Sequence, residues 1–174
     1  MLAVLRRFAE AFALAGSAMA CAAALLVTSS ITLRALTTRP IQGDVELTQF
    51  AIAIAISLAL PWCQLRGANI IVDFFTQRLS ARQSRRLDGI GALLVALLCA
   101  LLAWRTSVGA LSVYQATETS MILGLPMWWV YASLAPGLAL TALVALVQAG
   151  LHFREAPLAA LWGVEAPNDL PAAG

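Results

Sequence analysis

The chain has 174 residues, of which 61% are hydrophobic and 11% are charged, whereas an ordinary soluble domain carries roughly 25% charged residues. Its net charge of +2 provides no broad basic surface for nucleic acid, so we expect no nucleic-acid partner. The three cysteines (Cys21, Cys63 and Cys99) are odd in number and far apart, which argues against a disulfide framework and a clustered metal site.

Four long runs contain no Asp, Glu, Lys or Arg: residues 11–33, 47–65, 89–104 and 119–151. Crossing the hydrocarbon core of a bilayer takes roughly 20 helical residues, and these runs lack the alternation typical of membrane β-strands. We therefore predict an all-α integral membrane protein, whose residues 1–155 form four transmembrane helices at 11–33, 47–65, 87–110 and 125–150.

The first run is too long for a signal peptide, whose apolar core has roughly 7–15 residues, so we expect a retained helix. Small residues at 16–18 and 22–24 allow close helix packing there, either within the chain or against a partner.

The arginines lie asymmetrically about the four predicted spans. With a cytoplasmic N-terminus, the inner segments hold eight of the eleven basic residues: Arg6, Arg7, Arg66, Arg78, Arg82, Arg85, Arg86 and Arg154. The outer loops hold Arg34 and Arg39, together with acidic residues such as Asp44 and Glu46. Because basic residues in short loops favour the cytoplasmic side, we predict that both termini are cytoplasmic.

The segment between the second and third spans has a helical periodicity of its own. Apolar residues gather on one face of residues 68–79, while Asp73 and other polar residues gather on the opposite face. This pattern predicts an amphipathic helix in the membrane interface, whose flanking arginines contact lipid phosphates: Arg78, Arg82, Arg85 and Arg86. A solvated loop is the alternative. A capping box at 80–83 then predicts the start of the next helix.

The third and fourth spans contain residues that need an explanation. Arg105 interrupts the apolar pattern of the third span, which indicates either a protein contact or a side chain that extends outward to the interface. Pro126 is expected in the first turn of the fourth helix, and Pro136 inside it should loosen the helix hydrogen bonding. Trp128 and Trp129 are expected at the membrane surface. Residues 156–174 are predicted to form a poorly ordered cytoplasmic tail.

Two motifs resemble a known family. The first is RGANIIVD at 66–73, followed by RLS at 78–80. The second is TSMILGLPMWWVY at 119–131, followed by APG at 135–137. In this order and separation they resemble the small permease subunit of the tripartite ATP-independent periplasmic (TRAP) transporters, the DctQ-like family. Asn69 stands where that family often has a His.

The resemblance implies a non-enzymatic subunit of the bacterial inner membrane. It would sit beside a large TRAP permease subunit, which carries the transport path, and in contact with membrane lipids. A periplasmic solute-binding protein would deliver an organic acid, and a sodium gradient would drive its uptake. The small subunit would act as a scaffold, for which the candidate structural or partner contacts are Arg66, Asp73, Arg105, Pro126, Trp128, Trp129 and Pro136.

The residues themselves give little support to transport or catalysis by this chain alone. The spans hold no deep acidic residue, since Glu118 lies near an outer end, and His152 is the only histidine. No pattern indicates a cofactor, a metal site or a phosphate-binding loop. One alternative is an autonomous four-helix transporter acting as a homo-oligomer. A membrane enzyme is another, although only Asp73 and Asp88 lie on the inner side.

Overall fold

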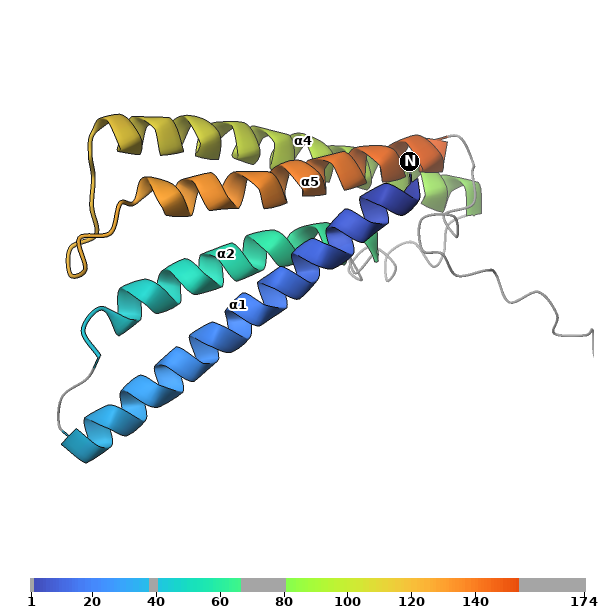
Figure 1. Ribbon diagram of the computed structural model, residues 1–174. Coiled ribbons are helices and arrows are strands. Elements are labelled where there is room, and N and C mark those ends of the chain that lie inside the picture. The colour runs from blue at the N-terminus through green and yellow to red at the C-terminus, as the bar shows by residue number, and fades with distance from the viewer. Residues whose placement is uncertain (1, 38–40, 67–80, 154–174) are drawn as a thin grey trace, which may run out of the picture.

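The computed structural model describes residues 2–37, 41–66 and 81–153 (Figure 1). These residues form four helices: α1 (Leu2–Thr37), α2 (Asp44–Leu65), α4 (Ala81–Gln115) and α5 (Trp128–Phe153). All four are long and apolar enough to cross a membrane, and the described residues contain no strand beyond one isolated bridge. The predicted all-α membrane fold with four spanning helices is therefore confirmed. The interfacial helix expected at 68–79 and the tail at 156–174 lie outside the described residues.

Two helices extend well beyond the predicted apolar runs. α1 begins at Leu2, where Arg6 donates to Glu10 over 2.8 Å in an i,i+4 pair that supports a helix in water. α4 continues through Arg105 to Gln115. Charged residues do not by themselves break a helix, so α1 and α4 are longer than the charge-free runs.

The fourth helix begins later than predicted. Pro126 was expected in its first turn, but α5 begins at Trp128. Pro126 instead forms the isolated bridge with Thr119, and its carbonyl accepts a 3.4 Å hydrogen bond from the Trp129 N–H. The loop preceding the helix holds this proline in the bridge, and so the helix cannot start there.

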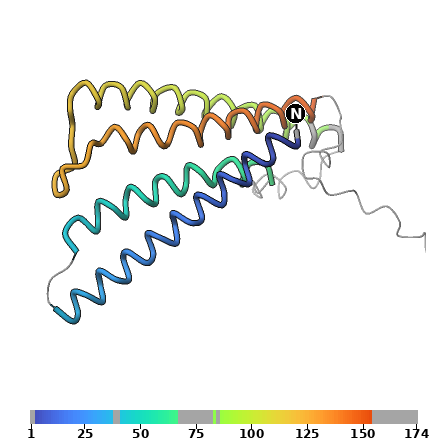
Figure 2. Tube along the Cα trace, viewed as in Figure 1, coloured from blue at the N-terminus to red at the C-terminus, as the bar shows by residue number. Residues whose placement is uncertain are grey.

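The helices pack in a row and not in a closed bundle. α4 packs on α5, α5 packs on α2, and α2 packs on α1 (Figure 2). Neighbouring helices are antiparallel except for α2 and α5, which run in the same direction (Figure 1). We call the end with the chain's N-terminus the N-terminal end; it also holds the ends of α2 and α5 and the start of α4. The opposite end, with the start of α2 and the loop 116–127, is the hairpin end.

A row leaves most of each helix uncovered. At most 22% of the residues in the apolar window of any span are buried within the chain. The buried apolar cluster is small and lies at the N-terminal end, where Leu5 and Ala9 of α1 meet Leu65 of α2 and Val144 of α5. Lipid or a partner protein must therefore cover the remaining apolar surface.

The first small-residue run packs within the chain. A Cβ added to Gly16 would lie 2.8 Å from the Ala55 carbonyl oxygen, so α1 and α2 approach closely at this point. In the second run only Ala23 is buried, while Ala22 and Ala24 face outward. The choice between internal and external packing is thus settled for Gly16 in favour of internal packing.

Candidate functional site

The backbones of α2 and α5 touch near the middle of both helices. Pro61 has no N–H, so the Ser57 carbonyl loses its usual helical donor. The Ser57 hydroxyl donates to the Leu134 carbonyl of α5 over 2.7 Å. A Cβ on Gly137 would lie 2.2 Å from the Ser57 carbonyl oxygen, closer than any real contact. Only glycine permits this approach, which joins the two central helices of the row.

Two buried amides form a second contact between α2 and α5, nearer the N-terminal end. We call this contact and the one at Ser57 and Gly137 the α2–α5 joints. The Gln64 Nε2 group donates to Gln148 Oε1 over 2.8 Å. Gln148 Nε2 in turn donates to the backbone carbonyls of Gln64 and Leu65, at 2.9 and 3.3 Å. The two side chains are only 8% and 6% exposed. Reciprocal hydrogen bonds of this kind fix both the register and the distance between α2 and α5.

Arg66 is the C-terminal cap of α2. Its backbone N–H donates to the Trp62 carbonyl over 3.0 Å, and its guanidinium lies 4.9 Å from the centre of the Trp62 ring. This cation–π contact places the charge just beyond the helix, where the polar surface of a membrane would begin. Asp73, a candidate contact residue, and Arg78, a candidate lipid contact, lie outside the described residues.

At the hairpin end, acidic residues at the start of α2 hold the neighbouring segments. The Glu46 carboxylate accepts from the backbone N–H groups of Ile122 and Leu123, at 2.9 and 3.2 Å. The Asp44 carboxylate accepts a hydrogen bond from the Ser30 hydroxyl of α1. The loop 116–127 therefore lies against α2, and α1 is tied to α2 at the same end.

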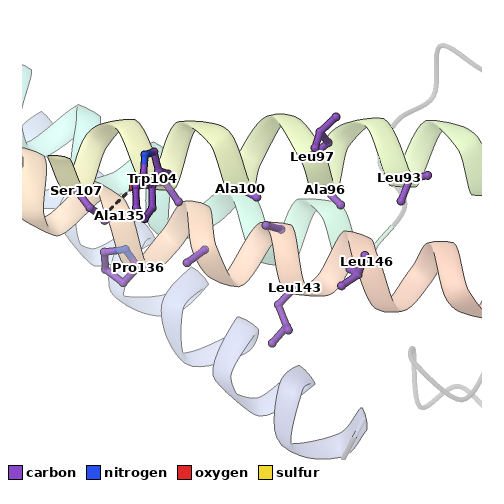
Figure 3. A pocket seen from close by; sticks show the side chains of 13 residues that line it. Leu93, Ala96, Leu97, Ala100, Trp104, Ser107, Ala135, Pro136, Leu143 and Leu146 are labelled. Atoms are coloured by element: carbon purple, nitrogen blue, oxygen red, sulfur yellow. Dashed lines mark hydrogen bonds between the residues drawn. The ribbon is translucent and has the colours of Figure 1, made fainter. Parts of the chain in front are cut away.

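An open apolar groove of about 870 Å³ runs between α4 and α5 (Figure 3). Trp104 and Pro136 line one end of it, and Leu93 and Leu146 line the other. Its polar lining residue, Ser107, already donates its hydroxyl to the Ala103 carbonyl over 2.8 Å. A groove of this chemistry suits an acyl chain or apolar side chains of a partner, and it offers no group for proton transfer.

The tryptophans predicted at the membrane surface lie together at the hairpin end. The Trp128 ring stands edge-on to Tyr114 at 5.5 Å and to Trp129 at 5.8 Å. Trp129 is 63% exposed and lines a second cavity of about 240 Å³ between α2 and α5. Such a cluster of amphipathic rings is typical of the bilayer interface.

The basic residues at the start of α4 are described only in part. Arg86 is exposed at the N-terminal end, whereas the side chains of Arg82 and Arg85 lie outside the described part of the structure. In the described residues no three His, Cys, Asp or Glu side chains come together as metal ligands would.

Arg105 is exposed on α4 and has no ion-pair or hydrogen-bond partner in the described part of the chain. It lies far from both ends of its helix (Ala81–Gln115).

The joint residues were not singled out in the sequence. Gln64 and Gln148 stand in apolar spans, each shortly before the basic residue that ends the span, Arg66 or His152. Two amides at matching depths are a signal for a buried pair, because an unpaired amide in a membrane is costly. Ser57 and Gly137 carry no such signal, since small residues are common in membrane helices.

Comparison with known families decides the identity of this arrangement. The sequence model of the family described as "Tripartite ATP-independent periplasmic transporters, DctQ component" matches residues 23–155, from the middle of α1 to just beyond α5. This chain belongs to the DctQ family. The resemblance found in the sequence is thereby confirmed, and the DctQ chain is a small, multi-pass membrane subunit of a bacterial TRAP transporter. No curated protein and no solved structure matches it.

Proposed function

We propose that this chain is a non-catalytic accessory subunit that braces the large permease subunit of a TRAP transporter. In this account the large subunit carries the transport path. A periplasmic binding protein delivers an organic acid to it, and a sodium gradient drives uptake. Membership of the DctQ family supports the assignment to a TRAP transporter.

One observation carries the bracing role. Every buried side-chain nitrogen and oxygen in the described residues already has a hydrogen-bond partner. The polar groups inside the spans, such as Ser57, Gln64 and Gln148, hold one helix against another. They are therefore not free to coordinate an ion or a substrate, and a rigid frame is the role that fits them.

The charge distribution supports an orientation with both termini in the cytoplasm of the bacterial inner membrane. The start of α1, the end of α2 and the start of α4 lie together at the N-terminal end of the row (Figure 1). These helix ends carry Arg6, Arg7, Arg66 and Arg86. The hairpin end carries acidic residues, including Glu46. This is the asymmetry expected of a cytoplasmic N-terminal end, where Arg86 would meet lipid phosphates.

Reconstitution into proteoliposomes tests the proposal. Vesicles would contain this chain alone, or this chain with the large subunit that co-purifies with it, and would receive the binding protein and a panel of labelled carboxylates. We expect uptake driven by an inward sodium gradient only when all components are present. Sodium-driven uptake by the chain alone would contradict the proposal and favour an autonomous transporter.

A further inference from the structure

The helix register places Arg105 near the middle of the membrane. A Cβ on Gly89 would lie 3.2 Å from His152, and one on Gly109 would lie 3.8 Å from Tyr131. Between these two contacts of the antiparallel helices α4 and α5, Arg105 falls level with Ala135 and Pro136. This is the level of the α2–α5 joint, because Leu134 and Gly137 on either side are both in contact with Ser57.

The depth of that joint can be read along α2. The nearest charged residues of α2 and its C-terminal cap are Glu46 and Arg66, which lie about 16 Å and about 14 Å from Ser57 at 1.5 Å per helical residue. The hydrocarbon core of a bilayer is roughly 30 Å thick, so its middle is about 15 Å from either surface. Ser57 and Arg105 thus share the mid-bilayer level.

At this depth the second alternative for Arg105, a side chain that extends to the membrane surface, becomes unfavourable. Arginines that extend to the membrane surface do so from near the ends of helices. By the distances along α2, Arg105 lies about 14 Å from the level of Arg66, the nearer of the two charged residues, and its side chain is shorter than that. An exposed guanidinium without a partner at mid-bilayer is costly, so its partner must come from outside the described chain.

Arg105 belongs to a stripe of exposed residues on the last helix of the row. The residues that α4 buries recur at Gly89, Ala92, Ala96 and Cys99 on the α5 side. On the opposite side of α4, exposed residues recur every three or four positions, and we call this set the Arg105 stripe: Leu94, Leu98, Leu101, Arg105, Val108 and Ser112. These positions recur at the helical period, so they form one continuous face along α4, and a neighbouring membrane helix packs against a face of this kind.

We propose that the Arg105 stripe binds a membrane helix of the large permease subunit that carries an Asp or Glu carboxylate at mid-bilayer depth. This inference rests on the proposed function and adds the surface and the chemistry of the contact. A carboxylate matches the planar guanidinium with two parallel hydrogen bonds and neutralises its charge.

Charge complementarity selects this occupant over a second copy of the chain or a lipid. The acidic side chains within the described residues lie toward the helix ends or in the loop after α4: Glu10, Asp44, Glu46, Asp88 and Glu118. A second copy in the same orientation could therefore bring none of these to Arg105. Lipid phosphates lie at the membrane surface, about 15 Å away.

Co-purification from native membranes in mild detergent tests the charge pair. We expect Arg105→Leu to reduce the large subunit recovered with the tagged chain by at least about tenfold, and Arg105→Lys to retain part of it. Arg34→Leu, a matched change of an exposed arginine on α1, should leave recovery unchanged. Monodisperse elution of each variant shows that it is folded. Unchanged recovery with Arg105→Leu would overturn the inference.

Photo-crosslinking locates the contact independently of the charge. A photoreactive residue at Leu101 or Val108 should crosslink to the large subunit, at a segment containing Asp or Glu, whereas one at the exposed Leu14 of α1 should not. An Arg placed at that acidic residue should restore recovery of the Arg105→Glu variant. Crosslinks from the Arg105 stripe that form only with lipid, or only with another copy of the chain, would overturn the inference and leave the proposed function intact. A wild-type chain that retains no larger subunit would overturn both.

Discussion

Replacing Gly137 with alanine is expected to lower the free energy of unfolding by about 3 kcal/mol, because the added methyl group cannot fit between α5 and α2. It would lie 2.2 Å from the Ser57 carbonyl oxygen, which is backbone and cannot swing away. The two helices must then separate, and the Ser57 hydroxyl would lose its bond to Leu134. The measurement is the midpoint of unfolding in mild detergent titrated with a denaturing detergent, followed by tryptophan fluorescence.

Gly150 provides the matched control on the same helix. A Cβ added there meets nothing within 4 Å, so Gly150→Ala should leave the midpoint unchanged or raise it slightly, as alanine favours the helix. Equal midpoints for the two alanine variants would show that α2 and α5 do not touch at Gly137.

Replacing Gln148 with leucine should cost about 2 kcal/mol of stability, which reflects the loss of three buried hydrogen bonds. The Gln64 amide loses the Gln148 oxygen as an acceptor, and the carbonyls of Gln64 and Leu65 lose the Gln148 amide as a donor. The same unfolding titration measures the effect. Gln49→Leu, on the exposed face of α2, is the control and should change stability little.

A double-mutant cycle separates the pair from its surroundings. Each single change removes the hydrogen bond that the remaining amide makes to its partner. Gln64→Leu combined with Gln148→Leu should therefore lower the free energy of unfolding by less than the sum of the two single changes. Strict additivity would indicate that the two amides act independently, contrary to the reciprocal hydrogen bonds of the structure.

The sequence was sufficient to predict the four membrane helices, because charge-free runs of this length have few other folds available. The capping box at 80–83 agrees with the start of α4 at Ala81, and the predicted end of the second span agrees with the end of α2 at Leu65. The start of α1 was not predicted, because that helix continues past charged residues once it leaves the lipid, as at Arg6 and Glu10. The start of α5 was also missed, because the bridge between Thr119 and Pro126 depends on the loop as a whole.

The joints between helices could not be predicted, because each depends on two residues far apart in the chain. Gly137 is informative only once Ser57 is known to face it, and the same is true of Gln148 and Gln64. Arg105 stood out in the sequence, but its depth follows only from the register of α4 against α5 and of α5 against α2. The role of Asp73 as a structural or partner contact remains a prediction, because Asp73 is outside the described residues.

The central claim is that this DctQ-family chain works as one subunit of a larger assembly. The most direct test is native mass spectrometry of the tagged wild-type chain extracted from its own membranes in mild detergent. The account predicts one dominant complex, in which a single, much larger multi-pass membrane protein accompanies this chain in constant ratio. A chain that is recovered alone, or only with copies of itself, would contradict the account.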